Sequence, residues 1–195
     1  MVELKKKKKK WFVIQASKEF RGVEIGEIPA PTLESLIGRT ISVPLSNLSK
    51  EGKRQTAQVT FEIVSVKDNK IDTEVKKMEL SPSSVKRVAR KGKNKIDDSF
   101  IAQTKDNVKV RIKPIILTRN KTTKPVLSLI RKNAKESLID KIKNTTYSEL
   151  IIKISNFNIQ KELKDKLNKL YPISFCQIRS LIKIGGSLNA TPSNK

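Results

Sequence analysis

The chain has 195 residues, and its 42 Lys and Arg against 19 Asp and Glu give a formal net charge of +23. It contains no His and a single Cys, which excludes intramolecular disulfides, Cys/His zinc sites and histidine acid–base chemistry. At 36% hydrophobic residues it is too apolar to be disordered throughout, and it has no apolar run near the roughly 20 residues that span a bilayer. We therefore expect a folded, soluble intracellular protein.

Residues 1–10 predict a disordered basic arm. Lys5 to Lys10 form an unbroken run of six lysines, and such like charges oppose any compact conformation in free solution. A chain with this excess of charge needs a polyanion to neutralise it, and nucleic acid is the first candidate. Anionic lipid also attracts polybasic tails. Because the remaining basic charge is spread along the chain, which a tail anchor does not require, we favour nucleic acid over a membrane.

The first strands are expected near the arm and after residue 37. The stretch from Trp11 to Ala16 is consistent with an edge strand, whereas Arg21 to Pro31, with two Gly and two Pro, is expected to be irregular. Alternating apolar residues in Gly38 to Leu45 predict a strand, and Pro44 places it at a sheet edge because proline lacks a ladder donor.

A hairpin and a short helix are expected next. Alternation over Thr56 to Lys76, broken by a turn at residues 67–70, is typical of two antiparallel strands. Ser81 followed by Pro82 predicts a helix start, with the serine side chain as the cap, and Gly92 predicts its end. Residues 86–95 then hold six basic groups and no acidic one.

The most informative local pattern lies between residues 99 and 117. A short strand over Ser99 to Thr104 and a turn at residues 105–107 lead into a strand over Val108 to Leu117. In that strand the alternating residues Lys109, Arg111 and Lys113 form a wholly cationic face, and the intervening residues are aliphatic. A strand of this kind has one side in a core and presents the other to a polyanion.

The last third of the chain is expected to alternate helices and strands. Apolar spacing predicts a helix from Pro125 to Ile142, a strand over Leu150 to Ile154, and a helix from Asn158 to Leu170. The final strand, Ile173 to Ile184, has Cys176, Ile178, Ile182 and Ile184 on its apolar side and Gln177, Arg179 and Lys183 on the other. The fold class is therefore α+β, with one domain over 11–186 (β-rich 37–118, αβαβ 125–184) and a polar tail over 187–195.

Several segments, in this order, resemble the archaeal and eukaryotic small-subunit ribosomal protein family S-three-A-e, also called eS-one. The matching segments span about residues 5–184 and are the lysine-rich start before Lys10-Trp11-Phe12, Leu36-Ile37-Gly38-Arg39, Thr104-Lys105-Asp106 with Val110-Arg111-Ile112, Ile130-Arg131-Lys132, Leu170-Tyr171-Pro172 and Ile178-Arg179. Asn107 stands where members often have Gly, which keeps a turn possible because Asn tolerates positive φ.

The resemblance implies a β-barrel-like body with added αβ elements, on the platform of the small ribosomal subunit near the messenger exit. The implied partners are small-subunit ribosomal RNA, neighbouring small-subunit ribosomal proteins and messenger RNA near its exit. The implied location is cytoplasmic and ribosome-bound, and the shortness of the chain fits an archaeal member. No enzymatic activity, cofactor, metal, membrane partner or small-molecule substrate is expected.

The residues expected to bind RNA are the cations of the arm, of the 86–95 cluster and of the basic strands, together with one aromatic residue. They are Lys5, Lys6, Lys7, Lys8, Lys9, Lys10, Trp11, Arg39, Lys86, Arg87, Arg90, Lys91, Lys93, Lys95, Lys109, Arg111, Lys113, Arg131, Lys132, Arg179 and Lys183. Arginines make planar bidentate contacts with phosphate, and lysines act as point charges. Trp11 has two alternatives, stacking on a base or packing at the edge of the core.

Two other functions are consistent with parts of the sequence. A free RNA chaperone or nucleic-acid-binding regulator would use the same cationic faces. A metal-dependent RNA-processing enzyme would use Asp97, Asp98 and Asp106, although Asp97 and Asp98 are adjacent and a strand would point them to opposite sides. Neutralising nearby lysines is a simpler role for these carboxylates. Cys176, in phase with isoleucines, is expected to be a small buried residue.

Overall fold

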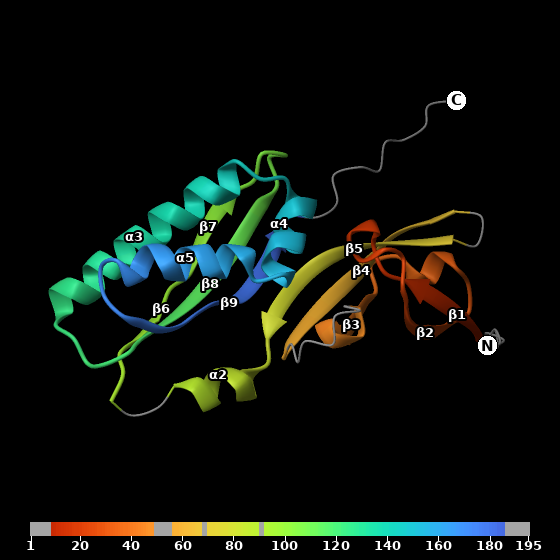
Figure 1. Ribbon diagram of the computed structural model, residues 1–195. Coiled ribbons are helices and arrows are strands. Elements are labelled where there is room, and N and C mark those ends of the chain that lie inside the picture. Colours follow the sequence, from red (N-terminus) through yellow and green to blue (C-terminus); the bar gives the residue numbers. More distant parts are fainter. Residues whose placement is uncertain (1–8, 49–55, 68–69, 90–91, 186–195) are drawn as a thin grey trace, which may run out of the picture. The chain divides into compact units, whose positions relative to one another are not determined.

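The computed structural model describes residues 9–48, 56–67, 70–89 and 92–185. The chain divides into two compact units (Figure 1). The N-terminal unit comprises residues 1–55 and 59–76, and the C-terminal unit comprises residues 56–58 and 77–195. Some of the predictions concern residues outside the described ones. These are the first eight residues of the predicted basic arm, the 187–195 tail, Arg90 and Lys91. The single domain expected over 11–186 stays a prediction.

The N-terminal unit is built mainly from strands and turns. Strand β1 (Lys10–Gln15) pairs antiparallel with β2 (Glu24–Ala30), and β3 (Thr40–Pro44), β4 (Ala57–Lys67) and β5 (Lys70–Leu80) are neighbours in that order. Between them lie the 3-10 turns η1 (Lys18–Phe20) and η2 (Glu34–Leu36) and the short helix α1 (Leu45–Leu48). The predicted first strand, the strand ending near Pro44 and the hairpin are confirmed.

The expectation that residues 21–31 are irregular is wrong, because most of them form β2. Two features make the strand possible despite its composition. Gly26 has φ +147°, and a Cβ there would meet the Cδ1 of Ile41 at 3.3 Å, so glycine allows close packing. Pro29 pairs with Trp11 in a two-stranded sheet, where an edge position tolerates the missing donor.

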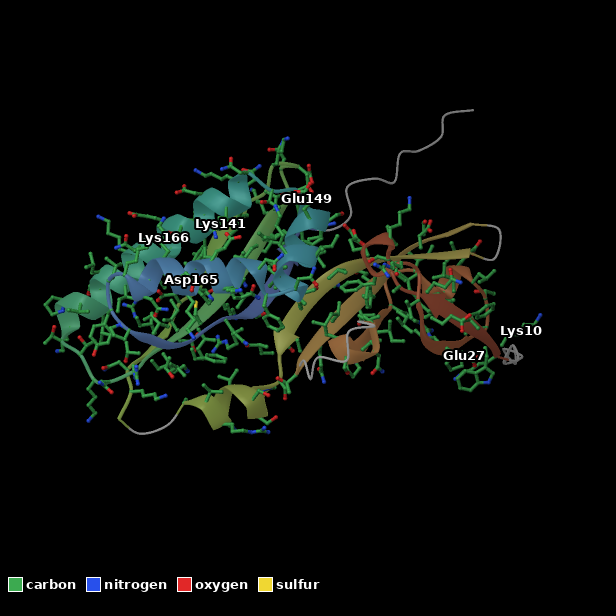
Figure 2. All side chains as sticks on the ribbon, viewed as in Figure 1. Lys10, Glu27, Lys141, Glu149, Asp165 and Lys166 are labelled. Carbon is green, nitrogen blue, oxygen red and sulfur yellow. The ribbon has the colours of Figure 1, made fainter. Side chains whose placement is uncertain are left out.

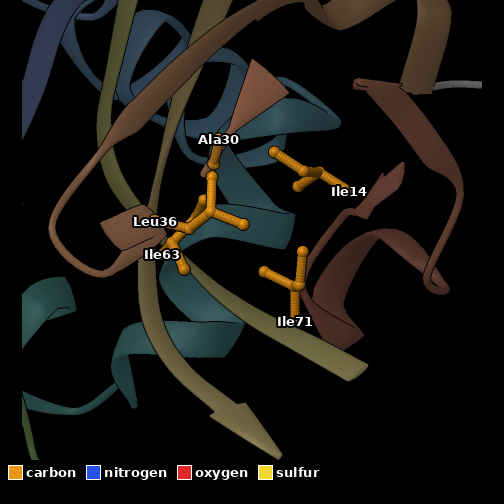
Figure 3. Packing of buried hydrophobic residues seen from close by; sticks show 5 residues of the cluster. All are labelled: Ile14, Ala30, Leu36, Ile63 and Ile71. Carbon is orange, nitrogen blue, oxygen red and sulfur yellow. The ribbon is translucent and has the colours of Figure 1, made fainter. Parts of the chain in front are cut away.

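Apolar side chains from β1, β2, η2, β4 and β5 meet in one core. Figure 3 shows Ile14, Ala30, Leu36, Ile63 and Ile71, which are buried against one another. Outside this group, the rings of Phe20 and Phe61 pack edge to face with centroids 5.7 Å apart. The unit is therefore held by aliphatic and aromatic packing.

The C-terminal unit contains an antiparallel sheet. The end of β5 pairs with β9 (Ile173–Ile184), which pairs with β8 (Lys109–Thr118). Strand β8 also pairs with β6 (Lys95–Asp97) and β7 (Phe100–Gln103). The predicted strands over 99–104, 108–117 and 173–184 are thus confirmed, and Asn107 has the expected positive φ of 60° in the turn. The described strands form no closed barrel, so the barrel-like body stays unconfirmed.

Three helices, α3 (Lys124–Lys143), α4 (Tyr147–Ser155) and α5 (Asn158–Asn168), gather on one face of this sheet (Figure 1). Helix α5 packs on β9 and α3 packs on β7. Buried residues of α3, such as Ile130 and Leu138, share this interior with Val110 and Ile112 of β8. We define the core side of the sheet as the side of Val110 and Ile112.

The strand expected over 150–154 is wrong, and so is the αβαβ order, because these residues belong to α4. Leu150, Ile151 and Ile154 are buried at helical spacing, whereas Ile152 is 41% exposed. The Thr146 side chain accepts a hydrogen bond from the Glu149 backbone N–H and caps the helix. Leu150, Ile152 and Ile154 have the alternation of a strand, but Leu150 and Ile154 are also one helical turn apart, and the cap at Thr146 marks the start of a helix.

Helix α2 (Pro82–Val88) begins at the expected proline, but two details differ. The Ser81 hydroxyl bonds the Ser83 hydroxyl at 2.7 Å and makes no capping bond to the backbone. The helix ends at Val88, before Gly92. Likewise Asn158 is the first residue of α5, and the capping position is held by Phe157 with φ 57°.

The side-chain phase of β9 also differs from the prediction. Ile178 pairs with Pro114 and Ser180 with Lys113, so Arg179 is an extra residue at a register shift. Beyond it Leu181 is fully buried opposite Ile112, and Ile182 pairs with Arg111 on the other face. Lys183 therefore returns to the core side, where its Nζ lies 5.6 Å from the centroid of the Tyr147 ring. The bulge inverts the expected sides of Ile182 and Lys183.

Candidate nucleic-acid interface

Among the residues that the structure describes, the positive charge is concentrated in one unit. In the described part of the C-terminal unit, 24 Lys and Arg stand against nine Asp and Glu, a formal charge of +15. In the described part of the N-terminal unit, eight Lys and Arg stand against seven Asp and Glu, a charge of +1. Among the described residues, the C-terminal unit is therefore the candidate for a nucleic-acid interface.

The sheet of the C-terminal unit carries a cationic face on the side away from its core. Lys109 and Arg111 are exposed and Lys113 is half-buried, whereas Val110 and Ile112 between them are fully buried. This confirms the pattern expected for the strand. Residues opposite one another in register share a side, which adds positions from four further strands. The cationic face comprises Lys77, Glu79, Lys95, Asp97, Ile101, Gln103, Lys109, Arg111, Lys113, Ser180, Ile182 and Ile184.

A cavity of about 460 Å³ opens on this face. Its cationic lining is Lys77, Lys86, Lys95, Lys113 and Arg179, which come from β5, α2, β6, β8 and β9. The rest of its lining is Glu79, Leu80, Pro82, Val85, Ser180 and Ile182. The structure thus brings together four predicted RNA-binding residues that are up to 93 positions apart in sequence. Lys77 was not among the residues predicted to bind RNA. The sequence signal that could have identified it is its position in an alternating strand.

The three carboxylates considered for a metal site have other partners in the structure. Asp97 accepts a bond from Arg179 Nη1 at 2.6 Å and lies 2.9 Å from Lys95 Nζ. Asp98 pairs with Arg131 Nε at 2.9 Å. Asp106 accepts the backbone N–H of Tyr147 at 3.0 Å. In the part of the chain that the structure describes, no group of three acidic or Cys side chains is placed to hold a metal. The simpler expectation for Asp97 and Asp98 is confirmed.

Several predicted residues lie elsewhere. Arg39 donates from Nη1 to the Pro29 carbonyl at 3.3 Å, and Lys93 donates to the Ser174 hydroxyl at 2.7 Å. Lys132 is exposed on α3, and Arg87 on α2. The arm residues in view are Lys9 and Lys10, and Figure 2 shows Lys10 at the start of the N-terminal unit, which also contains Glu27. Trp11 beside Lys10 is 68% exposed, so packing at the core edge is wrong.

The outer helices carry charges of both signs, unlike the β8 row. Figure 2 labels Lys141 on α3, Glu149 on α4, and Asp165 and Lys166 on α5. Lys141 bonds Glu162, and this bond holds the pKa of Glu162 below its ordinary value. Lys153 lies 3.7 Å from Glu149 one helical turn away. Lys141 and Lys153 therefore have acidic partners, unlike Lys109, Arg111 and Lys113 of β8 among the residues described.

Comparison with known proteins matches the model of the Ribosomal S3Ae family to residues 2–184, which is nearly the whole chain. The chain belongs to the Ribosomal S3Ae family. Among curated relatives, the small ribosomal subunit protein eS1 of Nanoarchaeum equitans is 31% identical over 89% of this chain and 87% of its own. That of Desulfurococcus amylolyticus is 30% identical, with 89% and 81% covered. That of Halorubrum lacusprofundi is 26% identical, with 98% and 87% covered.

Membership of the Ribosomal S3Ae family confirms the resemblance drawn from the ordered short segments. The relatives are archaeal, as expected from the sequence. The described chain also has no helix that is both long enough and apolar enough to cross a membrane.

Proposed function

We propose that this protein is a structural, non-enzymatic component of the small ribosomal subunit that binds ribosomal RNA through its C-terminal unit. The observation that carries the proposal is the family match over residues 2–184, together with archaeal relatives named small ribosomal subunit protein eS1. The concentration of charge, +15 in the described part of one unit, supports RNA as the partner.

The cationic face provides the mechanism. Each ammonium or guanidinium beside a phosphate releases condensed counterions, so affinity falls with salt by about 0.7 to 0.9 log units per log unit of salt for each phosphate. Lys109, Arg111 and Lys113 stand on a strand whose other side is packed in the core, which holds their positions. Because a rigid strand fixes the spacing of its cations, it fits one path of the RNA backbone. The lysine arm adds long-range attraction with little selectivity.

The family resemblance supports a finer placement as part of the same proposal. The protein would sit on the platform of the small subunit near the messenger exit, in the cytoplasm, beside neighbouring ribosomal proteins and close to messenger RNA. Chemical cross-linking of purified subunits tests this placement, since cross-links from Lys109 or Lys113 to RNA elsewhere on the particle would contradict it.

The test of the function itself is co-purification with the ribosome. Small subunits are isolated from the source cell on sucrose gradients, washed in moderate salt and analysed by quantitative mass spectrometry. A structural component is present at close to one copy per particle. A free RNA chaperone stays at the top of the gradient, so that result would contradict the proposal. Cleavage of ribosomal RNA by the purified protein would contradict its non-enzymatic part.

A further inference from the structure

One buried hydroxyl group of the C-terminal unit lacks a hydrogen-bond partner. Ser180 on β9 is 5% exposed, and its Oγ makes no hydrogen bond within the described structure. Most buried polar side chains in proteins are hydrogen-bonded, since leaving one unpaired costs its desolvation free energy. Ser180 also lines the cavity on the cationic face. A partner supplied from outside the chain would satisfy this hydroxyl.

The sheet register places this hydroxyl among charged groups. Ser180 pairs with Lys113 of β8 on one side and with Glu79 of β5 on the other. Arg179, the extra residue of the bulge, precedes it and is held by the 2.6 Å bond to Asp97. Bulges commonly redirect side chains at functional positions. Here the bulge allows consecutive residues, Arg179 and Ser180, to line the same cavity.

The charge balance of the cavity favours an anion. Its five cations are opposed by Glu79 of the lining and by Asp97, the partner of Lys95 and Arg179, which leaves a formal charge of +3. Glu79 lies 2.7 Å from Lys77. For Lys86 and Lys113, no carboxylate lies within 4.0 Å among the residues described. These two ammonium groups are therefore available to an incoming negative charge.

The remaining lining is apolar. Leu80, Pro82, Val85 and Ile182 form a wall beside the cations. A sulfate-like free ion would leave this wall uncovered, whereas a ribose–phosphate unit presents a charged group and an apolar sugar face together. The volume of about 460 Å³ lies within the usual range for sites that take small ligands or parts of larger ones.

We propose that this cavity binds one phosphate of an RNA strand, with the Ser180 hydroxyl donating a hydrogen bond to a phosphate oxygen and Lys86 and Lys113 neutralising its charge. Arg179, fixed by Asp97, is the second hydrogen-bond donor. The inference rests on the proposed function, because it assigns a specific contact to the same RNA partner. It adds an ordered phosphate site to a surface that would otherwise act by general attraction.

The N-terminal unit supplies a matched control. Ser17 is 7% exposed, its Oγ also lacks a hydrogen-bond partner in the described structure, and it lines a cavity of about 560 Å³. That cavity has two cations, Lys18 and Arg21, against Glu19, Asp72 and Glu74, a formal charge of −1. The two serines thus share burial and lack of partner but differ in the charge around them.

The experiment measures binding of small-subunit ribosomal RNA by fluorescence anisotropy across a potassium chloride series. The wild type is compared with Ser180→Ala, Lys113→Gln, Ser17→Ala and Lys161→Gln, the last on the exposed surface of α5. We expect Ser180→Ala to weaken affinity about fivefold to tenfold with no fall in melting temperature, because it removes an unpaired hydroxyl. Lys113→Gln lowers the salt slope by about 0.7 to 0.9. Ser17→Ala leaves affinity unchanged, and Lys161→Gln has a smaller effect than Lys113→Gln.

The outcomes separate the inference from the proposed function. If the wild type binds RNA but Ser180→Ala and Lys113→Gln behave like their controls, the phosphate site is overturned and the function stands. If the wild type does not bind, the proposed function fails first. Inorganic phosphate, added at constant ionic strength, should compete with RNA for the wild type more than for Ser180→Ala. If Ser180→Ala and Lys113→Gln both weaken the binding of inorganic phosphate but leave RNA affinity intact, the cavity is a site for a free anion. That result would overturn the assignment to RNA.

Discussion

The two units of this protein are alike in how they are held together and different in what they present. Each has a buried aliphatic core, with Leu36 and Ile63 in the N-terminal unit and Ile112 and Leu138 in the C-terminal unit. Yet the described part of the first is almost neutral at +1, and that of the second has a charge of +15. The net charge of the whole chain therefore does not describe either unit. Buried cores are present in both units, whereas the excess positive charge of the described residues is in one of them.

The difference arises mainly from basic residues, because the described part of the C-terminal unit has 24 Lys and Arg against eight in the N-terminal unit, whereas the acidic residues number nine and seven. In the N-terminal unit Lys76 pairs with Glu62 at 2.9 Å, so strand lysines are matched by neighbouring acids. On β8 the row of Lys109, Arg111 and Lys113 faces Ile184, Ile182 and Ser180 across the strand pair. Like charges side by side destabilise a sheet unless a counter-charge is near. We therefore expect RNA to stabilise the C-terminal unit more than the N-terminal one.

The largest effects are expected from truncating the two cores. Leu36→Ala and Leu138→Ala should each lower the free energy of unfolding by about 2–5 kcal/mol, because both side chains are almost fully buried. Only Leu138→Ala should also weaken RNA binding, since it loosens the unit that carries the charge. Hydrogen exchange of each unit and RNA anisotropy on the same samples measure both effects. Equal loss of RNA affinity in the two variants would end the distinction between the units.

The next effect comes from removing charge. Replacing Lys109, Arg111 and Lys113 by Gln should weaken RNA binding roughly 10-fold to 100-fold near 0.1 M salt and reduce the salt slope by about 2, for three phosphates. The matched triple variant of Lys18, Arg21 and Lys76 changes the net charge equally but in the near-neutral unit. A salt titration of both variants measures the contrast. If their slopes fall together, total charge matters and its placement does not.

An RNA contact made by Trp11 would weaken the contrast between the two units, because Trp11 belongs to the N-terminal unit. Its side chain is 68% exposed, so Trp11→Ala should leave the melting temperature nearly unchanged. If the indole stacks on a base, the variant loses about 1–3 kcal/mol of binding free energy, and RNA quenches the fluorescence of the wild type. We expect quenching. Trp11→Phe, which keeps an aromatic face, should retain most of the affinity. An unquenched indole would show that Trp11 does not stack on RNA.

Much of the C-terminal sheet was predictable because its signals are local. The alternation in Val108 to Leu117 places three cations opposite a buried aliphatic face, and the strand was found where expected. Asn107 adopts the predicted positive φ in the preceding turn. Periods of two and turn residues act over a few positions, so one sequence contains enough information to place them.

What could not be predicted depends on register and on contacts between distant segments. No local pattern shows that Arg179 is an extra residue in β9, yet this bulge sets which side Ser180 and Lys183 occupy. Lys77 and Lys86 join Lys113 in one cavity only through the pairing of β5, β9 and β8. The prediction for the α4 segment was wrong for another reason. Leu150, Ile152 and Ile154 alternate as in a strand, and the Thr146 cap upstream is the signal that indicates a helix. The sequence thus identified cations, and only the structure shows which of them share a cavity; their binding to RNA stays a prediction.

Cys176 offers the smallest effect and a test that separates stability from charge. Burial raises the pKa of its thiol to about 12, although the nearby charge of Lys164 lowers it slightly. The unfolded chain releases the proton near the ordinary pKa of about 8.5. The thiol therefore contributes its full stability below that pH, and the contribution is lost as pH rises toward about 12, because only the unfolded chain ionises.

The unfolding free energy of the wild type should thus fall by about 1 kcal/mol more than that of Cys176→Ala between about pH 8 and about pH 9.5. Urea titrations of both proteins at matched ionic strength measure the difference, which cancels the shared titration of lysines. Slow labelling of the folded protein by a thiol reagent gives an independent check, since the side chain is buried. Parallel pH curves would show that the thiol already ionises in the fold. Because Cys176 lies in β9 just before the bulge, ionisation there would disturb the strand that carries Ser180, and RNA affinity would fall with it.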